Sequence, residues 1–127
     1  EVKPYKVFTP FYKHLLARGL KVKPLTSCDS EAKEVLKNFI KLKLASYSKD
    51  RDFPALDGTS KLSSYLAFGE ISPRTIWHEI DKTGKSSDPF LRQLIWRDFA
   101  YHLLWYHPHT ETEPLREEYK KFPWKYN

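Results

Sequence analysis

The sequence predicts an all-helical fold, and three observations predict it. Apolar residues recur at spacings of three and four along several stretches, which is the pattern of amphipathic helices. Helix-starting and helix-stopping residues bound these stretches, with proline at first helical positions and glycine after last ones. No stretch alternates apolar and polar residues convincingly, although "KPYKVF" near the start is strand-like.

The first half of the chain contains two predicted helices joined by an extended linker around Pro24. In "FTPFYKHLLARGL", Thr9 is the expected N-cap, Pro10 takes the first helical position and Gly19 stops the helix. The second helix is expected from Asp29 to about Tyr47. Its apolar residues share one face: Ala32, Val35, Leu36, Phe39, Ile40 and Leu44.

The second half begins with an irregular segment, "RDFPALDGTS", which contains Pro54 and Gly58. Three helices are expected after it: at about 61–68, from Ser72-Pro73 to about Thr83, and, opened by Asp88-Pro89, from about Phe90 to Tyr106. The last of these is apolar on nearly every side, which predicts a buried helix. The polar end of the chain has a turn of helix near Glu117.

Length and composition limit the class of protein. A chain of 127 residues fits one domain or part of a larger one, and no apolar run is long enough to cross a membrane. The charged start lacks an initiator Met and a signal peptide pattern, so it is expected to be the boundary of a piece of a longer protein. The single Cys28 excludes an internal disulfide, and it suits a reducing compartment such as the cytoplasm.

The charge of the chain is unevenly distributed. The net charge is +6, and residues 1–50 hold eleven Lys and Arg against five Asp and Glu, whereas residues 51–127 balance at eleven against eleven. Such lysine-rich stretches are ordinarily solvated helix faces. A basic excess is also compatible with nucleic acid as a partner.

A cluster of hydroxyl residues in "GTSKLSSYLAFG" allows two interpretations. Thr59 or Ser60 can cap the helix that follows. Capping needs one hydroxyl, however, and three within five residues around Lys61 can also bind a diphosphate.

Arg97 lies on the longest helix and likewise allows two interpretations. A guanidinium on a buried helix needs an anionic or carbonyl partner, so it can form a structural salt bridge. Alternatively, it can line a cavity with Gln93 and the aromatic side chains near it, suited to a planar, phosphate-bearing ligand or a base. His107 and His109 lack partners at metal-binding spacing, so no metal site is expected.

Three stretches together resemble the flavin-binding region of DNA photolyases and cryptochromes: "YSKDRDFPALDGTSKLSSYLAFGEISPRTIW", "LRQLIWRDFAYHLLWYHP" and "EEYKKFPWKYN". They cover about residues 45–127 in family order. The opening "PYKVFTPFYKHL" is similar to the end of the family's antenna-binding α/β domain. The resemblance therefore implies that residues 1–24 end that domain and connect it to the next. Residues 25–127 would form the first part of the helical FAD domain.

The resemblance implies which residues bind the cofactor and the substrate. In the family, photochemistry belongs to reduced FAD, which gives an electron to a flipped-out pyrimidine dimer, so no catalytic side chain is expected in this stretch. The implied FAD-binding residues are Tyr47, Thr59, Ser60, Lys61, Leu62, Ser63 and Phe90. The implied DNA-binding residues are Arg51, Gln93, Trp96, Arg97 and Ala100, with Trp96 stacking on the dimer and Arg51 meeting a phosphate.

The implied function is light-dependent repair of cyclobutane pyrimidine dimers in damaged DNA by the parent protein, a lyase. Gln93 departs from the Glu usual in cyclobutane-dimer photolyases, so a (6-4) photolyase or a cryptochrome-type photoreceptor stays an alternative. The antenna chromophore would belong to the missing N-terminal domain. Because further flavin contacts of the family follow Asn127, the isolated piece is expected not to retain FAD, to be inactive and to associate with itself.

Overall fold

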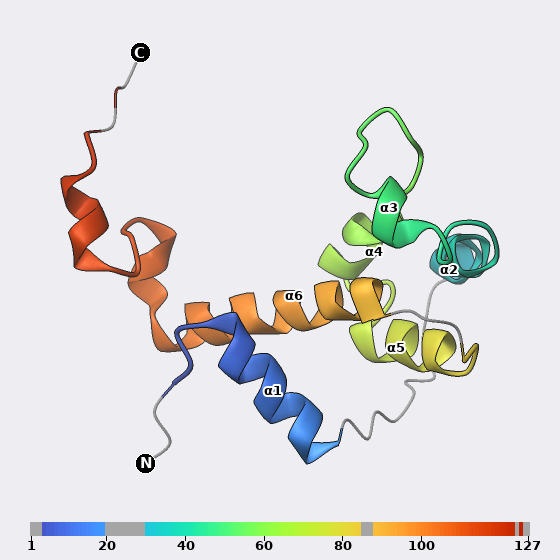
Figure 1. Ribbon diagram of the computed structural model, residues 1–127, viewed down its shortest axis with the longest axis horizontal. Coiled ribbons are helices and arrows are strands. Elements are labelled where there is room, and N and C mark those ends of the chain that lie inside the picture. Colours follow the sequence, from blue (N-terminus) through green and yellow to red (C-terminus); the bar gives the residue numbers. More distant parts are fainter. Residues whose placement is uncertain (1–3, 20–29, 85–87, 124, 126–127) are drawn as a thin grey trace. The chain divides into compact units, whose positions relative to one another are not determined.

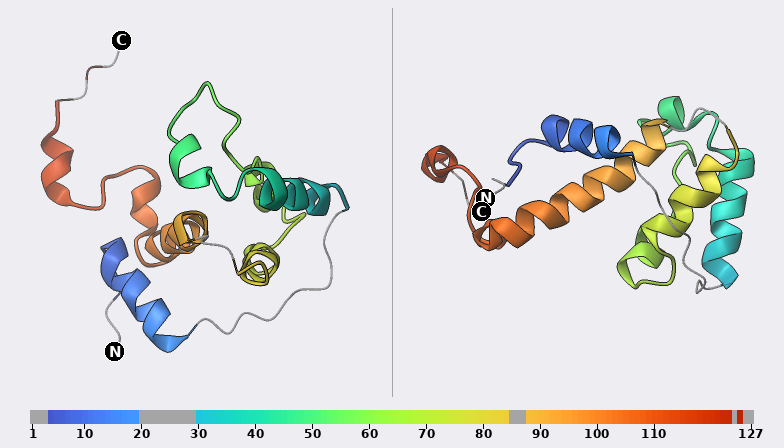
Figure 2. Two further views of the ribbon diagram at one scale, coloured as in Figure 1. Left: turned by 45° about the vertical axis from the view of Figure 1, so that its right-hand side comes forward. Right: turned by 90° about the horizontal axis from the view of Figure 1, so that it is seen from below.

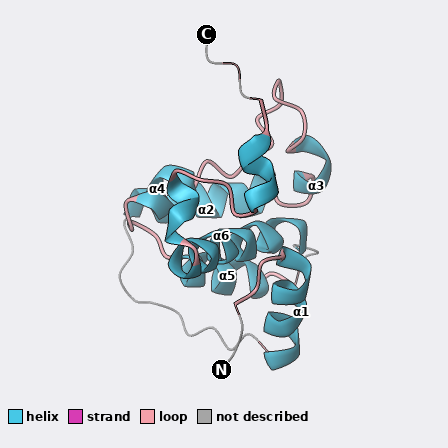
Figure 3. Cartoon of the chain, turned by 90° about the vertical axis from the view of Figure 1, so that its left-hand side faces the viewer, coloured by secondary structure: helices cyan, strands magenta, loops and turns pink. Residues whose placement is uncertain are grey.

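The computed structural model describes residues 4–19, 30–84, 88–123 and 125, and it is all helical across them, as expected (Figures 1 and 3). The linker around Pro24, Cys28 and the expected helix start at Asp29 lie outside the described residues. No described helix is both long and apolar enough to span a membrane. The elements are α1 (Phe8–Arg18), α2 (Ser30–Leu42), α3 (Tyr47–Asp50), α4 (Ser63–Ala67), α5 (Pro73–Asp81), α6 (Asp88–Tyr106), and the 3-10 helices η1 (Pro108–Glu111) and η2 (Glu117–Lys121).

The chain forms two compact units, and α6 contributes to both. One unit contains residues 20–94, and the other contains residues 1–19 together with 95–127. The boundary expected between residues 24 and 25 lies outside the described part of the chain.

The unit of residues 20–94 has the larger apolar core. The apolar face expected for α2 is confirmed, because Ala32, Leu36 and Phe39 are buried. Residues from α5, the start of α6 and the connecting segments complete this core: Leu44, Tyr47, Leu62, Ile71, Ile76, Ile80, Phe90, Leu91 and Leu94. Figure 2 shows these elements from two further directions.

The helix expected to reach Tyr47 instead ends at Leu42. The backbone N–H of Leu44 donates to the carbonyl of Phe39, five residues back, at 3.0 Å, and this interrupts the regular helical ladder. A turn follows, and Tyr47 then begins the separate helix α3. The turn buries Leu44 and Tyr47 in the core that α2 faces.

Two of the helix-boundary signals act as the sequence predicts, and one does not. Ser72 caps α5, because its Oγ accepts a hydrogen bond from the Thr75 N–H at 3.0 Å, and Pro73 follows it. Gly19 ends α1 with φ of 66°. The expectation that Thr9 caps α1 is wrong, because the helix begins at Phe8 and Val7 holds the N-cap position without a side-chain bond.

In the other unit, α1 packs against residues of α6 from Trp96 onward (Figure 2, right). The rings of Phe11 and Phe99 lie 5.3 Å apart between centroids. Before α1, the backbone N–H of Tyr5 donates to His102 Nε2 at 2.9 Å. The strand-like expectation for this segment is wrong, since its described residues 4–7 form no strand.

The expectation that α6 is buried throughout is also wrong. Phe90, Leu91, Leu94, Ile95 and Phe99 are buried. Several large side chains toward its C-terminal end are exposed instead, and the exposed fraction of Trp105 reaches 83%. The other exposed members of this set are Trp96, Tyr101, Leu104 and Tyr106.

His107 follows α6 and has a buried, unpaired nitrogen. Its Nε2 atom makes no hydrogen bond within the part of the chain that the structure describes. Desolvation lowers the pKa of His107, and the nearby positive charges of Lys6, His109 and His102 lower it further. The pKa of His107 is therefore lower in the folded chain than in the unfolded chain, so folding favours the neutral imidazole.

We predict that stability falls as the pH falls through about 6.5, the pKa of an unfolded histidine. As the pH falls, the unfolded state takes up a proton at His107 before the folded state does. The free energy of unfolding therefore decreases as the pH decreases. Urea unfolding between about pH 5 and pH 8 measures this slope. His107→Gln should flatten it, whereas His78→Gln on α5, which is not among the groups that shift the pKa of His107, is the control. An unchanged slope in His107→Gln contradicts the prediction.

Candidate functional site

The connection from α3 to α4, residues 51–62, contains Thr59 and Ser60 of the hydroxyl cluster. Gly58 allows this connection to pass close to α3. Gly58 is buried against the end of α3, where a Cβ added to it would lie 2.5 Å from Asp50 Cβ, 2.7 Å from Asp50 C and 2.8 Å from Asp50 O. Two of these atoms belong to the backbone and cannot move aside as a flexible side chain could. A residue without Cβ is therefore required for the connection to return to α3.

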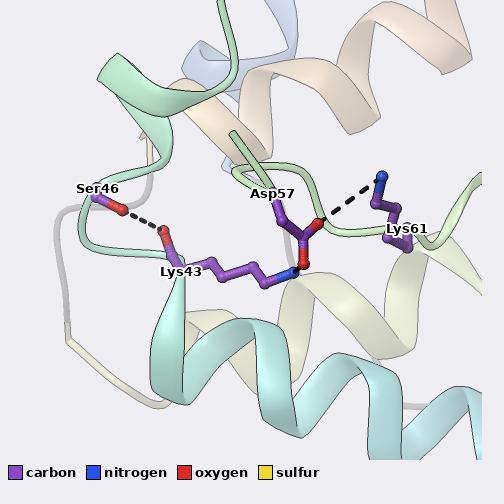
Figure 4. Close-up of polar contacts among 4 residues, drawn as sticks. All are labelled: Lys43, Ser46, Asp57 and Lys61. Atoms are coloured by element: carbon purple, nitrogen blue, oxygen red, sulfur yellow. Dashed lines mark hydrogen bonds and ion pairs between the residues drawn. The ribbon is translucent and has the colours of Figure 1, made fainter. Parts of the chain in front are cut away.

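Asp57, the neighbour of Gly58, links the connection to the turn after α2 (Figure 4). Lys43 Nζ donates to Asp57 Oδ2 at 2.5 Å, and Lys61 Nζ lies 3.8 Å from Asp57 Oδ1. The hydrogen bond from Lys43 lowers the pKa of the Asp57 carboxyl, the charges of both lysines lower it further, and partial desolvation opposes them. The Asp57 carboxylate thus forms ion pairs with two lysines from separate segments.

The interpretation of Thr59 or Ser60 as the cap of the next helix is wrong. Helix α4 begins only at Ser63, and Leu62 occupies the N-cap position without a side-chain hydrogen bond. Ser60 Oγ instead accepts a long hydrogen bond, 3.4 Å, from the Leu62 N–H. Within the described part of the chain, the hydroxyls of Thr59 and Ser63 have no recorded hydrogen bond, so both are available to a ligand.

The backbone between Ser60 and Ser63 has a geometry that suits an anion. Lys61 is left-handed, with φ of 57°, and Leu62 beside it is right-handed, with φ of −88° and ψ of −2°. When adjacent residues have left-handed and right-handed backbone conformations, their successive N–H groups point to the same side of the chain. Such an arrangement recurs at anion-binding sites. Thr59, Lys61 and Ser63 are exposed and Leu62 is buried, so this segment is anchored and presents its polar groups to solvent. These residues fit a diphosphate.

Tyr47 and Phe90, implied to touch the flavin, lie together in the core of the same unit. Their rings are perpendicular, with centroids 5.1 Å apart, and both contact Phe39. Both side chains are buried. The Arg51 guanidinium lies over the Tyr47 ring, 5.7 Å from its centroid, and Arg51 Nε lies 3.5 Å from Asp52 Oδ1. In this structure Tyr47 and Phe90 pack in the core, and their contact with the flavin stays a prediction.

The remaining residues implied to bind DNA follow one another along α6. Gln93 is half-buried and donates from Nε2 to the Pro89 carbonyl at 3.5 Å. Trp96 and Ala100 are exposed. Arg97 donates to the Tyr101 hydroxyl at 3.1 Å, and its guanidinium lies 4.7 Å from the centroid of that ring. Gln93, Trp96 and Arg97 lie within about one turn of α6, which thus carries an amide, an indole and a guanidinium.

An acidic neighbour lies beside Arg97. Partial burial raises the pKa of the Asp98 carboxyl, and the positive charge of Arg97 opposes this shift. For Arg97, the sequence allows two interpretations: a structural salt bridge, or a position in the lining of a ligand cavity. The observed contact with Tyr101 adds a third arrangement, in which a phenol orients the guanidinium along the helix.

Two other features lie apart from the predicted residues. An open hollow of about 620 Å³ follows η1, and its walls contain none of the residues implied to bind FAD or DNA. Its lining residues are Thr110, Glu111, Thr112, Glu113, Pro114, Tyr119 and Phe122. His107 and His109 lie with ring centroids 5.8 Å apart, and no group of three metal-binding side chains occurs among the described residues.

Sequence reasoning missed the residues that support the site. The spacing of Lys43 and Asp57, fourteen positions apart, gives no helical or strand signal. Gly58 was assigned only to an irregular segment, although a Gly directly before a hydroxyl cluster is a signal of close backbone approach. Phe8, which contacts Trp96, lies too far along the chain for any pattern to connect the two.

The chain is similar to known protein families and structures. Residues 90–127 match the family model described as the FAD binding domain of DNA photolyase. The chain is 30% identical to the deoxyribodipyrimidine photo-lyase of Alkalihalophilus pseudofirmus over an alignment that covers 98% of the chain and 34% of that protein. It is 37% identical to the enzyme of the same name from Thermus thermophilus, with coverage of 71% and 22%. The chain belongs to the DNA photolyase family.

The structure agrees with this assignment. A bacterial class III photolyase from Agrobacterium tumefaciens superposes with a TM-score of 0.78 and 28% sequence identity, over 96% of this chain and 34% of the other. The expected family and its helical FAD-binding fold are therefore confirmed. The chain spans about a third or less of the length of the photolyases it matches.

We predict that Gly58→Ala destabilises the chain by about 1–3 kcal/mol, the usual cost of overpacking a filled site. The added methyl group would overlap the Asp50 backbone, so α3 or the connection has to shift. Urea denaturation measures the change in the free energy of unfolding. Thr59→Ala, at the exposed next position, is the matched control and should change stability by less than about 0.5 kcal/mol. Equal stability of the two variants contradicts the close contact.

Proposed function

We propose that this chain is part of a light-dependent DNA photolyase that repairs cyclobutane pyrimidine dimers. The observation that carries the proposal is Trp96, an exposed indole within the stretch that matches the FAD-binding domain. The curated relatives share the name deoxyribodipyrimidine photo-lyase, which supports this substrate class. Damaged DNA is then the partner, and the cytoplasmic location, which the single Cys28 suits, stays part of the proposal.

We place the FAD diphosphate on the segment Thr59–Ser63. The exposed, unpaired hydroxyls of Thr59 and Ser63 and the opposite-handed pair Lys61 and Leu62 support this seat. When bound and reduced, FAD supplies the light-driven electron that splits the dimer. In this proposal the segment Thr59–Ser63 holds the diphosphate, and Tyr47 and Phe90 pack together in the core. The bound cofactor carries out the redox chemistry.

We assign DNA recognition to two different kinds of contact. A flipped-out base exposes a flat face, and the exposed Trp96 indole offers a matching face. Gln93, Arg97 and Ala100 lie on neighbouring turns of α6 and would border the same base. Arg51 is exposed and already carries a cation–π contact with Tyr47, so we assign it to a backbone phosphate. The first contact depends on the lesion, and the second does not.

We predict that, in the full-length parent protein, substitutions separate the two contacts. Trp96→Ala should reduce the preference for dimer-containing over intact duplex by about 5- to 150-fold, since a base–aromatic stack contributes about 1–3 kcal/mol. Arg51→Ala should weaken binding to both duplexes alike and reduce the salt slope by about one unit. Fluorescence anisotropy with both duplexes at several salt concentrations measures both effects.

Trp105→Ala is the matched control for Trp96→Ala, because Trp105 is a more exposed indole on the same helix. Circular dichroism and flavin content should be measured for every variant, since loss of folding would lower all affinities together. If Trp96→Ala keeps the full lesion preference, the repair assignment of this helix fails. A wild-type parent protein that holds FAD but shows no lesion preference would favour the cryptochrome-type receptor.

Three narrower expectations remain part of this proposal. We propose that the isolated chain does not retain FAD, which a titration followed by flavin anisotropy would decide, and that an antenna chromophore belongs to another domain of the parent. We also propose that the chain associates with itself, because Trp105 and Phe68 are 83% and 81% exposed. Sedimentation equilibrium measures this, and a monomer at every concentration contradicts it.

A further inference from the structure

Trp96 belongs to a column of stacked rings. Phe8 lies against its indole, with ring centroids 3.6 Å apart and an interplanar angle of 7°. Tyr12 lies on Phe8 in turn, at 5.6 Å and 18°. Phe99 meets Phe8 and Trp96 edge-on, at 5.8 Å from each. All four residues belong to the same compact unit, so these contacts lie within one body.

The distances determine which face of the indole is available. A centroid separation of 3.6 Å between nearly parallel rings is the contact distance of carbon atoms, so neither water nor a base can enter between Phe8 and Trp96. Phe8 is only 8% exposed, whereas Trp96 is 43% exposed. A planar ligand can therefore stack only on the indole face opposite Phe8.

We propose that Phe8 of α1 is a positioning residue for Trp96, and this role rests on the proposed lesion-binding function of Trp96. An indole at an exposed helix position has several rotamers open to it. Contact with Phe8 across the whole ring and with Phe99 at the edge holds the indole in one rotamer. The base then binds an indole that is already ordered. Binding therefore does not have to offset the entropy cost of ordering the tryptophan side chain.

Helix α1 offers a matched pair of variants. Phe8→Leu removes the flat ring that backs Trp96 and keeps an apolar side chain of similar size. Phe11→Leu makes the same change on the same helix, at a ring that contacts Tyr5, Phe99 and His102 but has no recorded ring contact with Trp96 among the described residues. Phe8→Tyr keeps the ring and is the conservative variant that should restore the wild-type behaviour.

Two measurements should be made on the full-length parent protein. Its tryptophans are replaced by 5-fluorotryptophan, and the Trp96 resonance is assigned in ¹⁹F NMR spectra by Trp96→Phe. Binding to dimer-containing and intact duplexes gives the lesion preference. Phe8→Leu should move the Trp96 resonance, because the ring current of Phe8 is lost, and should lower the lesion preference about 2- to 10-fold. Phe11→Leu and Phe8→Tyr should keep the wild-type preference.

The outcomes distinguish this role from the proposed function. If Phe8→Leu moves the Trp96 resonance but keeps the full lesion preference, Phe8 is a structural neighbour and the positioning role is wrong. An unmoved resonance also overturns it, because the stack would then be absent in solution. An equal loss in Phe8→Leu and Phe11→Leu overturns it as well, since α1 would act only through stability. If the wild-type parent protein shows no lesion preference, the proposed function fails and this role fails with it.

Discussion

Helix α6 carries apolar side chains on nearly every side, and a helix of that kind has to be covered by other elements. Its first turns, with Phe90, Leu91 and Leu94, complete the core formed by α2, α5 and the connecting segments. Farther along, Phe99 packs against Phe8 and Phe11 of α1. Gln93, Trp96 and Arg97 lie on this helix, and Tyr47 packs against Phe90 at its beginning, so the environment of these residues depends on how α6 is covered.

The connection from α3 to α4 shows how a site can be positioned without regular structure. Gly58 allows the chain to pass close to the Asp50 backbone, and Asp57 bridges Lys43 and Lys61. Exposed ion pairs contribute little to stability, typically about 0–1 kcal/mol, so the close approach at Gly58 is the stronger constraint. The ion pairs instead bring the ammonium groups of Lys43 and Lys61 to Asp57.

The aromatic residues of the candidate site have two different environments. Tyr47 and Phe90 are buried with Phe39, so they fix the packing of their unit before any ligand binds. Trp96 is held on one face and is otherwise partly open, so it can both pack and bind. A side chain that is already ordered loses less entropy on binding, which is why a backed, exposed ring is a better stacking surface than a free one.

The sequence by itself determined the helical class, the starts of α5 and α6, the stop at Gly19 and the apolar face of α2, because these follow from local spacing and from capping chemistry. It also determined the family, through "TSKLS" and "IWRD". Tertiary structure decided the end of α2 at Leu42, the exposed C-terminal half of α6 and the absence of a hydroxyl cap on α4. It alone brought Phe8 to Trp96 and Asp57 to Lys43, because a contact between residues far apart in the chain depends on packing and leaves no periodic trace in the sequence.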